Sequence, residues 1–254
     1  MKENYQFKDG RLIIQDSELG INIDTSFSPR MIPSDFSRSS EMVVKEGAEG
    51  MVLRAYFEVE GEFEGQYLLY YPDGTIETEC YYLKSELHGP SRFFSESGVC
   101  LSESWFYHGK KEGKSTRRFL SGKLSTLERY KKGLHQGKQE YYYENGAIKT
   151  VMSCKEGILE GEVSLYWPSG AKKREVTFQT GLREGFDRMW SVTGILLDEG
   201  KYQKGAPVGL HRRFYEDGTP QEERWYHSSL SYDLKKWDSS GTLHLERNEK
   251  DGSN

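Results

Sequence analysis

Residues 133–146 read GLHQGKQEYYYENG, and this stretch recurs in recognisable form every 24 residues. We call the positions spaced 24 apart a column and name each column by its number in the first repeat. Columns 65 and 74 carry glycine in all seven repeats between residues 61 and 228, and column 61 does so in six. These three columns hold 20 of the 27 glycines. A fixed short period without insertions predicts a stacked repeat array, in which each unit covers the apolar face of the next.

Each repeat has the signature of a β-hairpin. In the first repeat, residues 66–71 and 75–83 are rich in aromatic and β-branched side chains and are bounded by turns that contain glycine. No segment inside a repeat is long enough for a helix of about 10 residues. The sequence therefore predicts an all-β fold, an elongated single-layer antiparallel sheet of stacked 24-residue hairpins.

The residue before the glycine of column 74 is Asp, Ser, Asn or Thr, which suits two kinds of hairpin loop. One is a two-residue type I′ loop, and the other is a type I turn that closes on a left-handed glycine with a bulge. The bulged turn pairs Tyr70 with Ile76 and, with regular alternation beyond it, places columns 70, 76 and 82 on one apolar face. We therefore expect the bulged turn, with column 81 directly opposite the glycines of column 65.

The two ends of the chain depart from the repeat. Residues 1–40 are expected to form an N-terminal arm or edge cover that is partly disordered, and residues 41–60 a degenerate capping repeat. Residues 61–228 hold the seven clear repeats, and residues 229–254 form a degenerate C-terminal cap and tail. Caps are expected because the ends of a sheet expose pairing edges that promote aggregation.

The composition argues against several classes of protein. Only 35% of the residues are hydrophobic and 30% are charged, which suits a thin sheet with two wetted faces. No apolar run approaches the roughly 20 residues that span a bilayer, and the first residues lack the apolar core of a secretory signal. Three cysteines without pair spacing indicate a reducing compartment. We expect a cytoplasmic protein, with peripheral membrane association and non-classical secretion as open alternatives.

The recurring motif is Gly-x-x-x-Gly, an aromatic pair, Asn/Asp/Ser-Gly, and a further aromatic residue before the next glycine. It resembles the MORN repeat family, in the variant form found in bacterial YwqK-like antitoxin proteins, over about residues 61–228. The resemblance implies a solenoid of stacked β-hairpins that bind proteins or, in some members, acidic phospholipids. The antitoxin label implies neutralisation of a partner toxin.

Neither a catalytic nor a metal site is expected. The six histidines occupy different columns, and no His-x-x-x-His or Cys-x-x-Cys spacing brings two ligands together. Cys80, Cys100 and Cys154 fall on the parity assigned to the buried face, so we expect small buried hydrophobes. No serine or carboxylate lies in a nucleophile or phosphate-loop motif. The sequence predicts a non-enzymatic protein without a cofactor or a small-molecule substrate.

The charge changes sign along the array. Residues 61–108 carry 2 basic against 8 acidic residues, and residues 109–156 carry 12 against 5. Seven basic residues are candidates for binding a partner or an anion: Lys110, Lys111, Lys114, Arg117, Arg118, Lys131 and Lys132. They suit an acidic protein or an anionic membrane, and the alternative is a solvated face whose lysines prevent aggregation. Nucleic acid is not expected, because the net charge is -5 and no binding motif occurs.

Six aromatic residues form a candidate contact strip: Tyr81, Trp105, Tyr141, Tyr143, Trp167 and Trp225. Trp and Tyr are favoured anchors of interfaces, and the alternative for column 81 is that its aromatics cover the bare glycines of column 65. The leading hypothesis is a protein–protein interaction scaffold. Membrane binding through the basic repeats and an antitoxin role are the alternatives.

Overall fold

The structure is a computed structural model that describes residues 3–37 and 39–248. Within these residues the regular elements are β-strands, apart from one short 3-10 helix, η1 (Ala48–Gly50). The chain divides into two compact units, residues 1–137 and 138–254, which we call the first and second unit. The expected fold class, an all-β antiparallel array of hairpin repeats, is confirmed.

The first unit begins with a three-stranded antiparallel sheet, β1 (Glu3–Lys8), β2 (Arg11–Asp16) and β3 (Ile21–Ser26). Asp9 and Gly10 form the two-residue loop between β1 and β2, with φ angles of 54° and 70°, as a type I′ turn requires. Alternation places Leu12 and Ile14 on one side of the sheet, where both are fully buried. The segment expected as an arm is therefore a folded sheet over residues 3–26.

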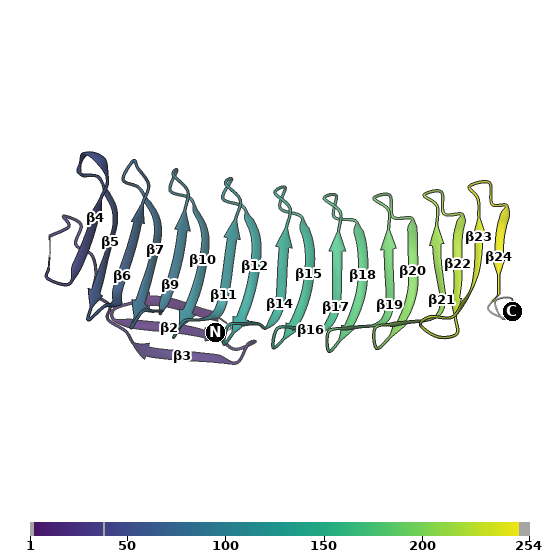
Figure 1. Ribbon diagram of the computed structural model, residues 1–254, viewed down its shortest axis with the longest axis horizontal. Helices are drawn as coiled ribbons and strands as arrows, with labels where there is room; N and C mark the ends of the chain where they lie inside the picture. Colours follow the sequence, from purple (N-terminus) through teal and green to yellow (C-terminus); the bar gives the residue numbers. More distant parts are fainter. Residues whose placement is uncertain (1–2, 38, 249–254) are drawn as a thin grey trace. The chain divides into compact units, whose positions relative to one another are not determined.

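The repeat strands of the first unit pair in sequence order (Figure 1). They are β4 (Met42–Glu46), β5 (Val52–Val59), β6 (Glu62–Tyr70), β7 (Ile76–Leu83), β8 (Glu86–Leu87), β9 (Gly89–Phe94), β10 (Cys100–Tyr107), β11 (Lys110–Arg118), β12 (Leu124–Lys131) and β13 (Leu134–His135). The first hairpin, β4 with β5, falls on residues 41–60, where the degenerate repeat was expected.

The second unit continues the same pattern. Its strands are β14 (Gly137–Tyr142), β15 (Ile148–Lys155), β16 (Ile158–Leu159), β17 (Gly161–Tyr166), β18 (Lys172–Gln179), β19 (Leu182–Trp190), β20 (Leu196–Gln203), β21 (Ala206–Phe214), β22 (Pro220–Tyr226), β23 (Tyr232–Trp237) and β24 (Leu243–Arg247). The last two strands pair with each other after residue 229, and residues 249–254 of the expected tail lie outside the described residues.

One end of each hairpin is the expected bulged turn. In the first repeat, the Gly74 N–H donates to Tyr71 O at 2.9 Å, and the Tyr71 N–H donates to Thr75 O at 2.8 Å. Gly74 has a φ of 86°, which closes the turn in the left-handed region. Tyr70 faces Ile76 as expected.

The other end is a two-residue loop stabilised by the preceding repeat. Lys132 and Gly133 both have positive φ, 52° and 83°, as in a type I′ turn. The Lys132 N–H donates to Oε1 of Glu112, 20 residues earlier, at 2.8 Å. The same bond joins Lys204 to Glu184 at 2.8 Å. The acidic residue of column 64 thus caps the turn that ends the hairpin.

The expected register is wrong beyond residue 76, because each hairpin contains a second irregularity. Tyr70 faces Ile76, but Leu69 faces Thr78, so one extra residue lies in the second strand. A bulge of this kind shifts the pairing by one residue and moves every later side chain to the other face. Column 82 therefore faces column 65, and column 81 faces column 66.

Two faces of the repeats follow from this register. The front face holds columns 66, 68, 70, 76, 79 and 81, and the back face holds columns 67, 69, 78, 80 and 82. Columns 70 and 76 share a face as expected, and column 82 does not join them. Cys100 lies on the front face, whereas Cys80 and Cys154 lie on the back face and are buried. The expectation that all three share one face is wrong for the same reason.

Neighbouring hairpins are also joined through their bulged turns. The Tyr71 hydroxyl donates to Phe94 O at 2.8 Å, and the Tyr143 hydroxyl donates to Tyr166 O at 2.9 Å. Trp167 donates from Nε1 to Trp190 O at 3.2 Å. Column 71 therefore links a turn to the backbone of the following repeat.

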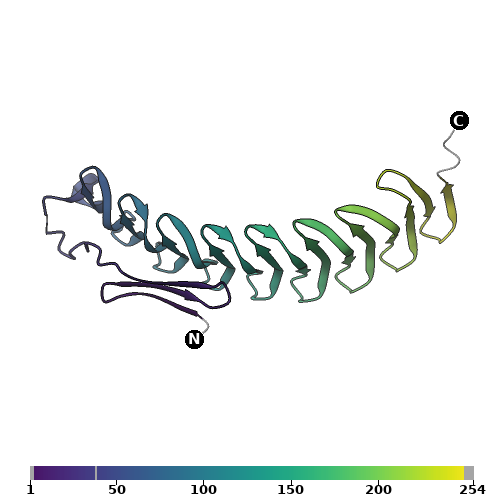
Figure 2. The ribbon, with the colours of Figure 1, turned by 90° about the horizontal axis from the view of Figure 1, so that it is seen from below.

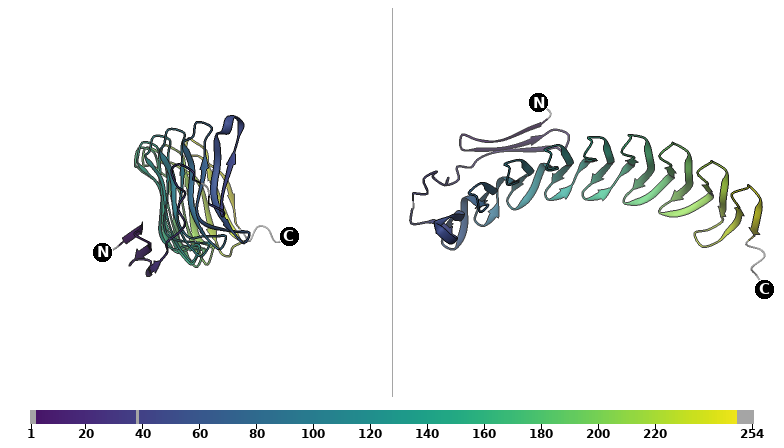
Figure 3. Two further views of the ribbon diagram at one scale, coloured as in Figure 1. Left: turned by 90° about the vertical axis from the view of Figure 1, so that its left-hand side faces the viewer. Right: turned by 90° about the horizontal axis from the view of Figure 1, so that it is seen from above.

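In the first unit, the N-terminal sheet packs crosswise on the front face of the repeats (Figure 2). Tyr81 and Trp105 of column 81 form one buried cluster with Leu12, Ile14 and neighbouring residues of β1–β3. The ring centroids of Phe7 and Tyr81 are 4.6 Å apart. Figure 3 shows the same sheet from two further directions. The main apolar core of the first unit thus lies between the N-terminal sheet and the repeats.

Candidate binding surfaces

The seven basic candidates do not form one surface. Lys114 lies on the front face beneath β1, where it pairs with Glu3 and lies 5.5 Å from the ring centroid of Tyr5. Lys111 lies 4.7 Å from the ring centroid of Tyr130, and burial lowers the pKa of its ammonium group. These two lysines are therefore occupied within the chain.

The two arginines of the set point to opposite faces. Arg117 belongs to column 69 on the back face, and Arg118 to column 70 on the front face. The Arg118 guanidinium donates to Gly122 O of its own turn at 3.1 Å. Because neighbouring strand residues alternate, the run of charges in the sequence is divided between two sides of the sheet.

Lys110, Lys131 and Lys132 come together at a cleft between β3 and the two-residue loops of the repeats. The cleft has a volume of about 510 Å³ and is also lined by residues of β3, including Ile21 and Ile23. Its lysines come from the ends of β11 and β12, because the loops place columns 83, 84 and 86 at one edge. This is the point at which the structure brings sequence-predicted basic residues together.

The six aromatic candidates do not form one strip either. Tyr81 and Trp105 are only 4% and 5% exposed beneath the N-terminal sheet, so the expectation that they contact a partner is wrong. Column 81 is not opposite column 65 as expected, because Tyr81 faces Gln66 and Trp105 faces Pro90. The Tyr81 side chain instead lies against Gly89 of the next repeat. The N-terminal sheet buries these two aromatic side chains, and the second bulge moves column 81 out of the expected register.

The other aromatic candidates lie in the second unit. Tyr143 and Trp167 belong to column 71 and hydrogen-bond the next repeat, and Tyr141 is half-buried in column 69. Trp225 is 51% exposed on the front face and faces Leu210. Trp225 is therefore the candidate that presents a large apolar surface.

The front face of the second unit also exposes Phe186, which is 44% accessible. Arg188 lies beside it, 4.2 Å from the centre of the phenyl ring, and donates to Glu199 at 2.6 Å. Glu199 also accepts from Arg212 at 2.9 Å. This face thus exposes two aromatic rings, Phe186 on β19 and Trp225 on β22, together with the ion pairs of Arg188 and Arg212 to Glu199.

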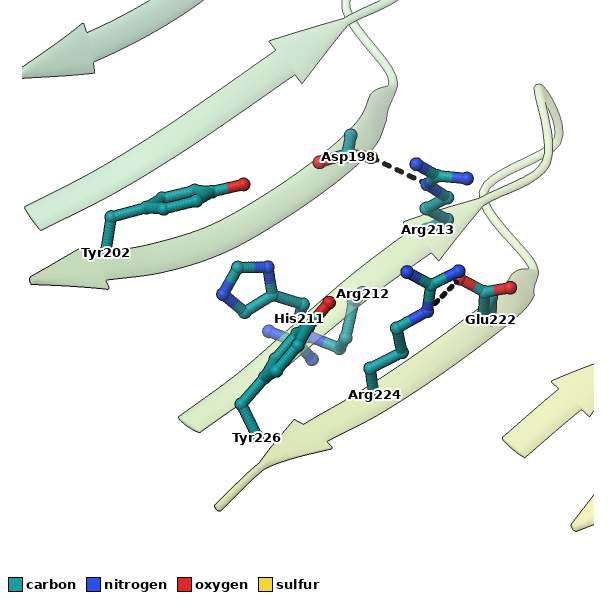
Figure 4. Close-up of a pocket in the computed structure, with 8 residues that line it drawn as sticks. All are labelled: Asp198, Tyr202, His211, Arg212, Arg213, Glu222, Arg224 and Tyr226. Atoms are coloured by element: carbon teal, nitrogen blue, oxygen red, sulfur yellow. Dashed lines mark hydrogen bonds and ion pairs between the residues drawn. The ribbon is translucent and has the colours of Figure 1, made fainter. Parts of the chain in front are cut away.

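The back face of the second unit carries a charged groove that the sequence analysis missed (Figure 4). Arg213 donates from Nε to Asp198 at 3.0 Å, and Arg224 pairs with Glu222 at 2.8 Å. The groove has a volume of about 110 Å³, well below the 300 Å³ or more of small-molecule sites. In the sequence, the groove is indicated by side chains of opposite charge in columns 69, 78 and 80. These columns share a face only in the observed register.

His211 lies between the rings of two tyrosines in this groove, Tyr202 and Tyr226, with centroid distances of 5.1 and 4.7 Å. Its Nε2 is 2.8 Å from Lys201 O. Next to the groove, Arg174 makes two hydrogen bonds to Asp187, which raise the pKa of its guanidinium. Arg174 and Asp187 satisfy each other, as expected of a structural ion pair.

A family model for the MORN repeat variant matches residues 63–84, 136–153 and 159–180. The matched segments are in phase with the 24-residue period, and the repeats between them keep the same glycine columns. The chain is a MORN-repeat protein. No curated protein matches it.

MORN repeats generally occur in proteins that bind other proteins or membranes. Among residues 3–37 and 39–248 of this MORN protein, no group of three His, Cys, Asp or Glu side chains is arranged to hold a metal ion. Within the same residues, no helix is long and apolar enough to cross a membrane. The repeats present three surfaces: a basic cleft, a front face with exposed aromatic side chains, and a groove lined by ion pairs.

Proposed function

We propose that this MORN protein is a non-enzymatic scaffold that binds a partner protein through the front face of its second unit. The supporting observation is the packing of β1–β3 on the front face of the first unit, where Tyr81 and Trp105 become almost fully buried. The chain thereby provides an internal example of what this face of a MORN repeat can bind. The occupant is a β-sheet that presents a row of apolar side chains.

The two front faces are built from equivalent positions. Trp225 occupies the same column as Trp105, and Arg188 and Glu199 repeat the pair formed by Arg92 and Glu103 at 2.7 Å. In the first unit Trp105 lies beneath the N-terminal sheet, whereas Trp225 is half exposed. Trp is a frequent hot spot in interfaces. We therefore infer that the partner offers a β-strand or hairpin with an apolar row to Phe186 and Trp225.

A protein partner is favoured over a membrane by the distribution of charge. Binding to an anionic membrane needs several basic side chains that face the same way. Lys111 and Lys114 are occupied inside the first unit, and Arg117 and Arg118 point to opposite faces. We further propose a cytoplasmic location, which the three free thiols favour. The antitoxin role is the special case in which the partner is a toxin.

Site-specific photo-crosslinking in the native cell tests this proposal. A benzophenone amino acid at position 225 or 186 should yield an adduct with one defined protein, and the same probe at Met189, on the back face, should not. The Phe186→Ser, Trp225→Ser double variant should lose that partner in affinity capture while its circular dichroism is unchanged. Equal crosslinking from all three positions would contradict the proposal.

A second arm separates the alternatives. Sedimentation with anionic vesicles should leave the full chain in the supernatant. Strong binding to vesicles that weakens with salt, without a protein adduct, would replace the proposed partner with a membrane. Concentration-dependent self-association lost in the double variant would instead assign the open face to a second copy of the chain.

A further inference from the structure

The cleft between β3 and the repeats of the first unit is large enough to hold a ligand. Its volume of about 510 Å³ falls within the range of small-molecule sites. Ile21, Ile23 and Tyr107 supply apolar surface to the cleft, and Lys110 and Lys132 line it with them. Such sites combine apolar walls with a few polar groups that fix the orientation of a ligand.

The charge around the cleft is strongly positive. Lys110, Lys131 and Lys132 line it together with a single carboxylate, that of Glu112. The Lys131 ammonium donates to two backbone carbonyls, Leu19 O at 2.9 Å and Gly20 O at 3.2 Å. These carbonyls hold the ammonium in place without neutralising its charge.

One oxygen of the Glu112 carboxylate accepts a hydrogen bond from the described part of the chain, and the other does not. Glu112 is 6% exposed, and its Oε1 accepts the Lys132 N–H at 2.8 Å. Its Oε2 is buried and has no hydrogen-bond partner within the described residues. Burial raises the pKa of Glu112, so this carboxyl offsets the lysines less than an exposed one would.

We propose that this cleft binds a small organic anion, with a carboxylate or phosphate group at Lys110 and Lys132 and an apolar body against Ile21, Ile23 and Tyr107. The site is confined to the first unit and does not depend on the proposed protein partner. An ammonium group attracts a phosphate or carboxylate through a charge-assisted hydrogen bond. The apolar wall distinguishes a ligand with a hydrocarbon body from inorganic phosphate.

The repeats themselves indicate which substitutions the fold accepts. Column 86, which contains Lys110, carries glutamate at Glu86, and column 84, which contains Lys132, carries it at Glu156. Glu156 adopts the same positive φ as Lys132, 52° in both. The Lys110→Glu, Lys132→Glu double variant is therefore compatible with the fold. Lys204→Glu is the matched control, because Lys204 occupies the equivalent turn in the second unit with the same acidic cap.

Calorimetric titration of the full chain with hexyl phosphate, hexanoate, hexanol and inorganic phosphate tests the proposal. Both organic anions should bind at saturable levels, and the neutral alcohol and inorganic phosphate at least tenfold more weakly. The double variant should weaken anion binding at least tenfold, whereas Lys204→Glu should change Kd less than twofold. Amide shifts of Gly20 and Asn22 in NMR spectra should move with the same saturation curve.

Several results would overturn the proposal. Equal binding of hexanol would remove the role of the lysines, and equal binding of inorganic phosphate would remove that of the apolar wall. An unchanged Kd in the folded double variant would place the anion elsewhere. If anionic vesicles bind in a manner sensitive to Lys110→Glu but hexyl phosphate does not bind, the lysines recognise a membrane surface rather than a free anion.

Discussion

Equivalent columns have different roles in the two units of the chain. In the first unit, column 81 supplies Tyr81 and Trp105 to a core shared with the N-terminal sheet. In the second unit, the same column supplies Trp225, half of whose surface is accessible. A column of a repeat protein therefore does not define a role by itself. The role depends on whether another segment covers that face of the repeat.

The largest expected difference between the units concerns the two tryptophans of column 81. Trp105→Ala should lower the free energy of unfolding by about 3–5 kcal/mol, because it leaves a cavity beneath Tyr5 and the rest of the N-terminal sheet. Trp225→Ala should cost about 0.5 kcal/mol, as is usual for a surface substitution. Urea unfolding followed by circular dichroism measures both. Similar losses in the two variants would show that the two faces are not differently covered.

A second difference should appear on acidification, because His88 is buried in column 64, where the second unit has Glu160 and Glu184. Burial, with a smaller effect from the charge of His108, lowers the pKa of His88 from 6.5 to about 4. The unfolded chain therefore binds the proton more readily, and stability falls as the pH falls from about 6.5 to 4. The loss is at most about 3.4 kcal/mol, at 1.36 kcal/mol per pKa unit.

Urea unfolding at a series of pH values measures this loss. His88→Gln is the matched control, since Gln136 occupies the same column naturally and does not titrate. The variant should lose the pH dependence between 4 and 6.5. If it keeps the whole dependence, the proton binds elsewhere.

The third test compares two glycines of column 65 with positive φ, Gly113 at 73° and Gly209 at 65°. Alanine costs about 1–2 kcal/mol at both, because the left-handed conformation disfavours a Cβ. At Gly113 the Cβ would also overlap the ring of Tyr5, whereas at Gly209 it meets nothing within 4 Å. Gly113→Ala should therefore be more destabilising by about 2 kcal/mol, as expected of an overpacked contact. Hydrogen exchange of β1 and β2 should rise in Gly113→Ala alone, and equal exchange in both variants would argue against the observed packing of β1.

The smallest expected effect concerns Lys131 and Lys155, which share column 83. Lys131 holds the carbonyls of Leu19 and Gly20, and Lys155 is exposed in the second unit. Lys131→Met should lower the free energy of unfolding by about 1.5 kcal/mol, the lower value for a hydrogen bond to a charged group. Lys155→Met should leave it almost unchanged. Thermal unfolding measures both. A cost at position 155 equal to that at 131 would rule out this contact as the cause.

The sequence was sufficient for the repeat but not for its faces. The spacing of the glycines predicts the hairpins and the turn at Gly74, because left-handed backbone restricts residue choice. The bulge after Ile76 restricts the choice of residue far less. The sequence therefore does not reveal the register shift that moves column 82 to the back face. Tyr81 and Trp105 are buried for a separate reason, because the N-terminal sheet covers their face of the repeats.

The N-terminal sheet was predictable in part. Asp9-Gly10 lies between the alternating residues of β1 and β2, and Asp-Gly flanked by such alternation is a strong hairpin signal. Which face of the repeats this sheet covers depends on long-range contacts such as that of Phe7 with Tyr81. The cleft at Lys110 and Lys132 follows from the same packing. The sequence therefore indicated its lysines but not its apolar wall.

The acidic cap of column 64 has a consequence for how such a chain changes length. Glu112 belongs to one repeat, and the Lys132 N–H that it accepts belongs to the next turn, 20 residues later. A deletion between the two groups would separate them from this pairing, whereas the loss of a complete 24-residue period would restore it with the next turn. We therefore expect the array to tolerate the gain or loss of complete periods better than that of partial ones.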